Sequence, residues 1–278
     1  MSNNNEAKNK ESISKTLIVA LAVSLISAFF VSGAAIGLKP IQVQNQQLDK
    51  QKNILQIAGL LSVEDSANPE KNSANLVENM FKERIRPQVV DLQEGKIIDN
   101  PEINVNTFNA VSVAKDPQTS IELSDKQDIA KIRRRENFSV VYWVVNPQTG
   151  ENENLIIPIR GYGLWSTLYG FLAIKADDLN TVVGLGFYQQ GETPGLGGEV
   201  DNPRWKALWH GKTLFAADGT PNIQIVKGGV REDSADAVHQ VDALAGASLT
   251  SRGVNNLLHF WLGENGFGKF INNLKNNS

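Results

Sequence analysis

The stretch Asp242-Ala243-Leu244-Ala245-Gly246-Ala247-Ser248-Leu249-Thr250 is a run of small residues that ends in two hydroxyl side chains. It directly precedes the apolar segment 249–262, whose pattern predicts a helix. Because Gly246 has no Cβ and its alanine neighbours have short side chains, a ligand can approach this backbone closely. The start of the helix offers unpaired N–H groups and a positive dipole end, which suit a phosphate. The stretch therefore predicts a loop that can hold a ligand at a helix N-terminus.

Two interpretations of the hydroxyl residues fit this composition. In the simpler one, Ser248 or Thr250 is a helix N-cap, because serine and threonine supply an acceptor oxygen at that position. In the other, one hydroxyl is presented for chemistry, either as a phosphate contact or as a covalent attachment point. The stretch alone does not distinguish them, so the evidence has to come from the remainder of the chain.

The N-terminal part of the chain predicts a membrane anchor. Residues 1–15 are polar, whereas residues 16–38 carry no charge and consist mainly of Leu, Ile, Val, Ala and Phe. At about 1.5 Å per residue this run reaches roughly 35 Å, enough to cross a hydrocarbon core of about 30 Å. A cleaved signal peptide is the alternative, because small residues occupy 32–35, but signal peptides have apolar regions of only about 7–15 residues. We expect a retained single-pass transmembrane helix.

The flanking charges give the expected organisation of the chain. Lysines flank the apolar run in nearly equal numbers, but a large following domain is translocated largely regardless of its charge. We therefore expect a cytoplasmic tail at 1–15, a helical connector and linker at 39–75, and a soluble domain outside the cytoplasm at 76–278. The length of that last part fits either one domain or two lobes.

The middle of the chain has the pattern of a β-sheet. Short β-branched and aromatic runs, separated by turn signals, lie at 139–145, 155–159, 169–174, 181–190 and 222–226. Helical patterns lie at 75–84, 204–210, 234–239, 249–262 and near the C-terminus. Several hairpins with a few flanking helices predict an α+β fold, in which a largely antiparallel sheet follows the single transmembrane helix.

Composition excludes several classes of function. The net charge of −3 argues against nucleic acid as a partner, because proteins that bind it usually carry a dense basic face. The chain has no cysteine, which excludes disulfides, thiolate catalysis and cysteine-ligated metal sites. His210, His239 and His259 are too widely spaced for a local metal site, so we expect none. Any redox chemistry then depends on a cofactor held by other groups.

Three further segments stand out chemically. In 160–167 (RGYGLWST), Trp165 fits either the core or a flat surface that binds a ring. The segment 191–199 has four glycines in nine residues, which allows close ligand approach, but it lacks the GxGxxG fingerprint of dinucleotide-binding folds. The basic run 131–136 (KIRRRE) predicts a solvated face or a partner contact.

The stretch 242–250 resembles the Asp-x-x-(Ser/Thr)-Gly-Ala-Thr-x-Thr motif of flavin-bearing domains, in which the phosphate of FMN is joined to the first threonine. The order of motifs along nearly the whole chain is similar to that of the C subunits of bacterial sodium-translocating NADH:quinone oxidoreductases. Besides the anchor, the shared segments are 163–166 (GLWS), 191–200 (GETPGLGGEV), 203–205 (PRW), 211–212 (GK) and 260–263 (FWLG). Ser248 and Ala245 depart from the motif, although a serine hydroxyl is an equivalent phosphate acceptor.

The resemblance implies a soluble FMN-binding domain that carries one FMN, joined through a phosphoester to Ser248. Asp242 matches the aspartate that supports recognition by the flavin transferase, and Thr250 matches a helix-capping or transferase-recognition position. Leu164, Trp165 and Leu196 are expected to cover the ring. The complete set of expected FMN-binding residues is Leu164, Trp165, Ser166, Glu192, Thr193, Gly195, Leu196, Gly197, Lys227, Gly246, Ala247, Leu249 and Thr250.

Within this set, Glu192, Thr193 and the backbone of 195–197 are expected to make polar contacts at the edges of the ring. Lys227 is expected to balance the charge of the phosphate. Ser166 and the residues flanking Ser248 complete the pocket.

The resemblance also implies a function: an electron-relay subunit of a membrane complex that transfers electrons from NADH to ubiquinone and exports Na⁺. This chain alone would hold no complete active site. The implied partners are other subunits, especially a second FMN-bearing membrane subunit, together with the flavin transferase and the membrane. The implied location is the bacterial inner membrane, with the soluble domain in the periplasm. The alternatives are the G subunit of a related ferredoxin:NAD electron-transport complex and a cofactor-free membrane-tethered scaffold.

Overall fold

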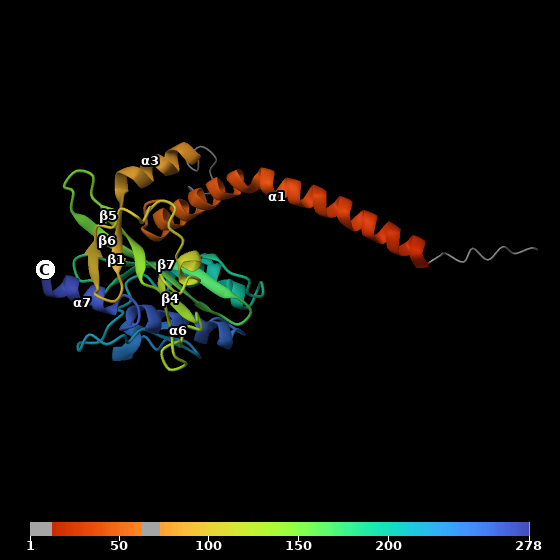
Figure 1. Ribbon diagram of the computed structural model, residues 1–278. Helices are drawn as coiled ribbons and strands as arrows, with labels where there is room; N and C mark the ends of the chain where they lie inside the picture. Colours follow the sequence, from red (N-terminus) through yellow and green to blue (C-terminus); the bar gives the residue numbers. More distant parts are fainter. Residues whose placement is uncertain (1–12, 63–72, 278) are drawn as a thin grey trace, which may run out of the picture. The chain divides into compact units, whose positions relative to one another are not determined.

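A computed structural model describes residues 13–62 and 73–277 (Figure 1). The chain forms two units, one ending at Gln46 and the other, a compact domain, beginning at Gln47. Helix α1 (Ile13–Ile57) contributes to both units. Most of the predicted tail (1–12) and part of the predicted linker (63–72) lie outside the described residues.

Helix α1 begins with the apolar segment that was expected to cross the membrane. Residues 13–46 are all exposed, including large apolar side chains such as Leu21, Phe29 and Ile36. The helix is long enough and apolar enough to span a membrane. The sequence indicated a separate connector helix after residue 38, whereas the structure has one continuous helix of 45 residues with Pro40 inside it. A proline inside a helix removes only one backbone hydrogen bond, so α1 continues through Pro40.

Six antiparallel strands form the main sheet of the compact domain, which confirms the predicted α+β class. The strand order is β2-β1-β5-β6-β7-β8. The four strands β5 to β8 follow one another along the chain as hairpins, with Tyr142 opposite Ile156 and Ile157 opposite Leu172. The strands are β1 (Ile85–Asp91), β2 (Lys96–Ile98), β5 (Phe138–Val145), β6 (Asn152–Tyr162), β7 (Thr167–Lys175) and β8 (Val182–Gln189).

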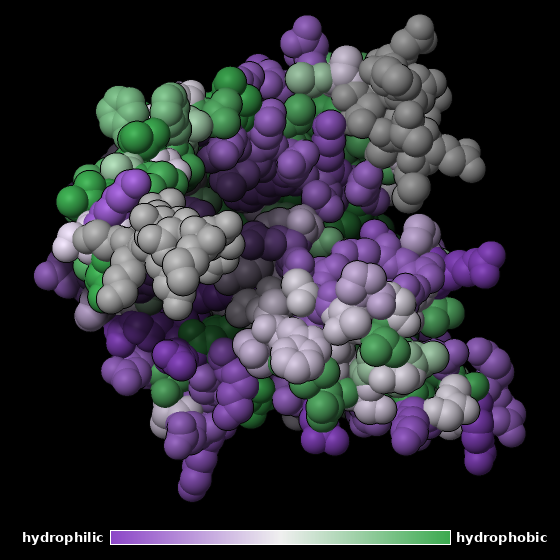
Figure 2. All heavy atoms as spheres, turned by 90° about the vertical axis from the view of Figure 1, so that its right-hand side faces the viewer, coloured by the Kyte–Doolittle hydropathy of each residue, from purple (hydrophilic) through white to green (hydrophobic). Residues whose placement is uncertain are grey.

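Helices cover both faces of this sheet (Figure 1). Helices α6 (Ser248–Leu262) and α7 (Gly268–Asn277) pack on one face, and the end of α1 packs with α3 (Ala74–Arg84) on the other. Alternate residues of β5 enter the two cores: Val141 and Trp143 face α6, whereas Val140 and Tyr142 face α1 and α3. Both faces of β5 are therefore buried, which explains its run of apolar and aromatic residues from Val140 to Val145. The surface shown in Figure 2 carries many hydrophilic residues, with hydrophobic residues scattered among them.

Short elements surround the sheet. The predicted strand at 222–226 is β9 (Gln224–Val226), which pairs parallel with β10 (Gln240–Asp242) outside the main sheet. The predicted helix at 204–210 is shorter, as α5 (Pro203–Ala207), and the one at 234–239 is the 3₁₀ helix η2 (Ala235–His239). The other short elements are α4 (Ala110–Ala114), β3 (Ser120–Glu122), β4 (Arg134–Glu136) and the 3₁₀ helix η1 (Gly197–Asp201).

The basic run 131–136 is only in part the solvated face that its composition indicated, because Lys131 and Arg133 are exposed and its last residues are not. Its last residues form β4, which pairs with β3, and both Arg135 and Glu136 are buried. The Glu136 carboxylate forms an ion pair with Arg160 of β6, at 2.6 Å from Oε2 to Nη2. Because the partner lies 24 residues away, no local pattern in the run reveals this burial.

Candidate functional site

The loop before α6 follows the backbone path that its small residues allow. Gly246 has a φ of +72°, in the left-handed region that favours glycine, and a Cβ there would lie 3.0 Å from Cδ2 of Leu196. Ser251 holds the loop: its Oγ accepts a hydrogen bond from the N–H of Leu244 at 3.0 Å and donates one to the carbonyl of Ala247 at 3.0 Å. Sequence reasoning missed Ser251, whose only signal is its position in the first turn of the helix. The loop is thus fixed without bulky side chains.

The two hydroxyls at the start of α6 have different environments, and neither caps the helix. The N-cap is Ala247, and no side chain forms a cap hydrogen bond there. Ser248 is the first helical residue; it is exposed, and its hydroxyl has no hydrogen-bond partner within the described residues. Thr250 is only 1% exposed and donates to Oε2 of Glu192 at 2.7 Å. The capping interpretation is therefore wrong for both, and of the two only Ser248 is open to modification.

Glu192 joins three segments that lie far apart in the sequence. Its carboxylate accepts hydrogen bonds from the backbone N–H groups of Leu164, Trp165 and Ser166, at 2.9 to 3.2 Å, and from the hydroxyl of Thr250. Burial of Glu192, which is 5% exposed, disfavours the charged form, but the hydrogen bonds from Thr250 and the backbone outweigh it and lower the pKa of this carboxyl. A buried carboxylate with these donors fixes the segment 164–166 against the start of α6.

Glycines allow this close approach. A Cβ on Gly163 would lie 2.7 Å from Oε1 of Glu192, and one on Gly197 would lie 2.5 Å from Oγ1 of Thr250. Gly253, one turn into α6, is equally constrained, because its Cβ would lie 2.5 Å from the carbonyl oxygen of Tyr162. The glycines of the two loops are needed for packing around Glu192 as well as for any approach of a ligand.

Large apolar side chains stay exposed beside this polar centre. Trp165 is 67% exposed, Leu249 50% and Leu196 44%, so Trp165 does not occupy the core position that the sequence also allowed. Leu164 and Ser166 are half-buried, and Thr193 and Gly195 are exposed. Exposed tryptophan and leucine side chains on segments that are bonded or packed against the start of α6 offer apolar surface for an aromatic ring.

Asp242 and Lys227 lie at the other end of the loop, where β9 and β10 meet. Oδ1 of Asp242 accepts a hydrogen bond from the N–H of Val230 at 2.6 Å, and its carbonyl accepts one from the indole of Trp205 at 2.8 Å. Lys227 is exposed and forms no ion pair within the described ranges 13–62 and 73–277. The contacts just described connect the segments 164–166, 192–197 and 246–250, and Lys227 takes no part in them.

Comparison with known proteins places this geometry in a family. The FMN-binding domain family matches residues 163–263, which contain all three connected segments. The C subunit of the Na(+)-translocating NADH-quinone reductase of Pseudomonas aeruginosa is 55% identical over 267 residues, covering 96% of this chain and 98% of that protein. The C subunit of the Yersinia pestis reductase is 45% identical, covering 96% of this chain and 95% of that protein. The crystal structure of Shewanella oneidensis NqrC has a TM-score of 0.72 at 36% identity, covering 84% of this chain and 99% of that one. The chain therefore belongs to the family of Na(+)-translocating NADH-quinone reductase C subunits.

Proposed function

We propose that this chain carries one FMN as a phosphoester on Oγ of Ser248. The observation that carries the proposal is the contrast between the two hydroxyls: that of Ser248 is exposed and unbonded within the described residues, whereas that of Thr250 is buried and bonded to Glu192. Formation of the ester replaces the hydroxyl hydrogen with the FMN phosphoryl group, with the overall loss of one water. The phosphodiester keeps one negative charge, which the N-terminus of the 15-residue helix α6 stabilises.

The surrounding residues fit an isoalloxazine ring. Leu164, Trp165 and Leu196 supply apolar cover from two loops that Glu192 and the close contact at Gly246 hold next to α6. Thr193 and the backbone of 195–196 are exposed at the rim and can meet the polar edge of the ring, whereas Gly197 is buried. The carboxylate of Glu192 is turned inward to its own chain, so we assign it the positioning of 164–166. Ala247 and Leu249 flank the attachment point, and Lys227 balances charge at a greater distance.

In this proposal the chain is a one-flavin electron relay within a Na⁺-translocating NADH:ubiquinone reductase. When bound, FMN accepts and releases electrons, and a phosphate tether leaves its ring electronics to the noncovalent neighbours. The protein holds the ring beside Trp165 and shields one side of it from water. Electrons would arrive from upstream centres and pass to a second FMN on a neighbouring membrane subunit. Helix α1 would anchor the chain in the bacterial inner membrane, with the compact domain in the periplasm.

The two alternatives are less well supported. The relatives reported above are C subunits and cover nearly the whole chain, which favours this complex over the G subunit of a ferredoxin:NAD complex. The match to the FMN-binding domain family and the exposed apolar side chains of Trp165, Leu196 and Leu249 favour a chain that carries a cofactor over a cofactor-free scaffold.

Intact-mass analysis and in-gel fluorescence after co-expression with the flavin transferase test the attachment. The wild-type chain should gain the mass of one FMN less one water, and Ser248→Ala should gain nothing. Ser248→Thr, which restores the residue of the family motif, should be modified like the wild type. A fluorescent Ser248→Ala protein would move the attachment to another hydroxyl. A colourless wild type together with a colourless Ser248→Thr protein would favour the scaffold.

A further inference from the structure

A cleft of about 1020 Å³ opens beside β4, β6 and β7, and none of its lining residues belongs to the expected FMN set. Two carboxylates, Asp125 and Asp128, and two aromatic rings, Tyr162 and Tyr169, take part in the lining. The cationic lining residues come from three separate segments: Lys115, Lys131, Arg133, Arg134 and Arg160. A concave site of this size lies at the upper end of the range that small-molecule pockets occupy, about 300–1,000 Å³.

Three of the five cations are available to a ligand. Arg160 is paired with Glu136, and Arg134 contacts the exposed Glu122 at 3.2 Å. Within the part of the chain that the structure describes, Lys115, Lys131 and Arg133 form no ion pair. A solvated lysine needs no partner, but these three unpaired cations outnumber the two carboxylates of the lining, Asp125 and Asp128, by one, so the cleft carries a net positive charge.

The backbone places two of these cations at a conformational cost. Lys131 and Arg133 have φ angles of 56° and 64°, in the left-handed region that non-glycine residues rarely adopt. The carboxylate of Asp128 holds the turn, because it accepts the backbone N–H groups of Ile132 at 2.7 Å and Arg133 at 2.8 Å. Asp128 is therefore committed to the backbone, and both residues forced into this conformation carry a cationic side chain of the cleft. Such outliers concentrate at functional sites.

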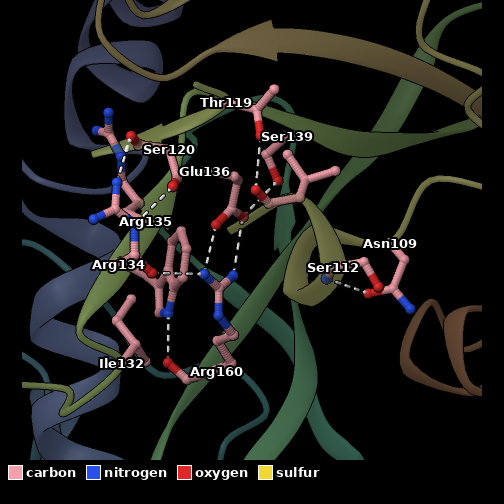
Figure 3. Close-up of polar contacts among 12 residues, drawn as sticks. Asn109, Ser112, Thr119, Ser120, Ile132, Arg134, Arg135, Glu136, Ser139 and Arg160 are labelled. Carbon is pink, nitrogen blue, oxygen red and sulfur yellow. Dashed lines mark hydrogen bonds and ion pairs between the residues drawn. The ribbon is translucent and has the colours of Figure 1, made fainter. Parts of the chain in front are cut away.

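The buried side of the cleft is rigid. Figure 3 shows the Arg160 guanidinium between the carboxylate of Glu136 and the carbonyl of Arg134, with distances of 3.0 and 2.6 Å to Glu136 and 3.2 Å to the carbonyl. The guanidinium also lies over the ring of Trp261, 5.1 Å from its centroid. Arg160 is 7% exposed, so this pair is almost fully desolvated and keeps one geometry. This ion pair therefore forms a rigid wall of the cleft, and the charge available to an anion comes from Lys115, Lys131 and Arg133.

From this arrangement we propose that the cleft binds a phosphate-bearing anion. Lysine and arginine side chains donate charge-assisted hydrogen bonds to phosphate oxygens, and the two tyrosines can contact an apolar or ring-containing remainder of the ligand. The anion can be a soluble phosphate compound or the headgroup of a phospholipid, since both present the same oxygens. The hydroxyl of Tyr162 donates to the carbonyl of Trp165 at 3.3 Å, which links the cleft to the loop 164–166.

Isothermal titration calorimetry on the full chain in neutral detergent tests this proposal. The probes are pyrophosphate, dihexanoyl phosphatidylglycerol, dihexanoyl phosphatidylcholine as the zwitterionic control, and a short polyglutamate peptide. The cleft variant is Lys131→Gly/Arg133→Gly, which removes two cations and suits the left-handed backbone. The matched control is Lys82→Gln/Lys96→Gln, which removes two exposed cations outside the cleft. Lys115→Gln provides a second cleft variant if the double glycine variant does not fold.

We expect saturable binding of pyrophosphate or phosphatidylglycerol that weakens at least tenfold in the cleft variant and less than twofold in the control. Binding of pyrophosphate identifies a soluble phosphate site, and binding of phosphatidylglycerol alone identifies a lipid headgroup site. The proposal is overturned if neither phosphate probe binds, if both double variants lose affinity equally, or if only polyglutamate binds. The last result would make the cleft a docking site for an acidic protein segment.

Discussion

At the scale of single residues, Glu192 is the side chain whose removal should most destabilise the contact between the segment 164–166 and the start of α6. Replacement by glutamine leaves one acceptor oxygen for four donors and turns an amide N–H₂ group toward backbone N–H groups. Hydrogen bonds to a charged group contribute about 1.5–3 kcal/mol, so Glu192→Gln should lower the free energy of unfolding by about 2 kcal/mol. Thr250→Val removes one donor only and should cost less. Denaturant unfolding of the detergent-solubilised chain measures both, and equal stabilities for all three proteins would contradict this role.

The same carboxyl predicts a pH dependence. Because its pKa is lowered in the folded protein, its stabilisation is complete above the pKa of the unfolded chain, about 4.3, and is lost as the pH falls through the folded value. The difference in stability between wild type and Glu192→Gln should therefore be constant near neutral pH and shrink below about pH 4. Unfolding curves recorded at several pH values test this, and a difference that grows in acid would have the wrong sign.

At the scale of elements, the contact between α6 and the loop after β6 depends on Gly253. A Cβ there would lie 2.5 Å from the carbonyl of Tyr162 and 2.8 Å from Cα of Gly163. Overpacking typically costs about 1–3 kcal/mol, whereas alanine gains about 1 kcal/mol over glycine in helix propensity. We expect Gly253→Ala to lose about 1 kcal/mol on balance, although propensity alone predicts a gain. The exposed neighbour Arg252→Ala is the control, and a stabilised Gly253→Ala protein in the same unfolding measurement would refute the close packing.

Elements with a strong local pattern were predictable, and those defined by distant partners were not. The strands β5 to β8 and helix α6 follow from their apolar runs and turn signals. Strand β1 was missed because Pro87 resembles a helix end. At Pro87 the strand pairs with β5 but not with β2, whose pairing begins at Val89. The missing N–H of the proline therefore interrupts no hydrogen bonds to β2. The burial of Glu136 and the role of Ser251 depend on contacts that only the fold creates.

In the candidate site, too, some features were predictable from the sequence and others depend on contacts between distant residues. Ser248, Trp165 and Leu196 came from motif resemblance, and the structure leaves all three exposed, as a ligand surface requires. Composition alone could not separate Ser248 from Thr250, and only the motif resemblance favoured Ser248. The physical difference lies in the hydrogen bond from Thr250 to Glu192, which is 58 residues away. The resemblance also implied that Glu192 makes a polar contact at the edge of the ring, which stays a prediction. In the structure its carboxylate is bonded to the segment 164–166 and to Thr250.

At the scale of the whole molecule, the orientation in the membrane determines which compartment the relay faces, and the absence of cysteine makes it measurable. A single cysteine introduced into the wild-type chain is the only thiol. We expect Gln148→Cys, at an exposed turn of the compact domain, to react in intact cells with a maleimide that cannot cross the inner membrane. Ser2→Cys, in the polar tail before α1, should react only after that membrane is permeabilised, because a short tail stays inside while the large domain is translocated. The opposite labelling pattern would place the domain in the cytoplasm, and labelling of both sites in intact cells would show mixed insertion.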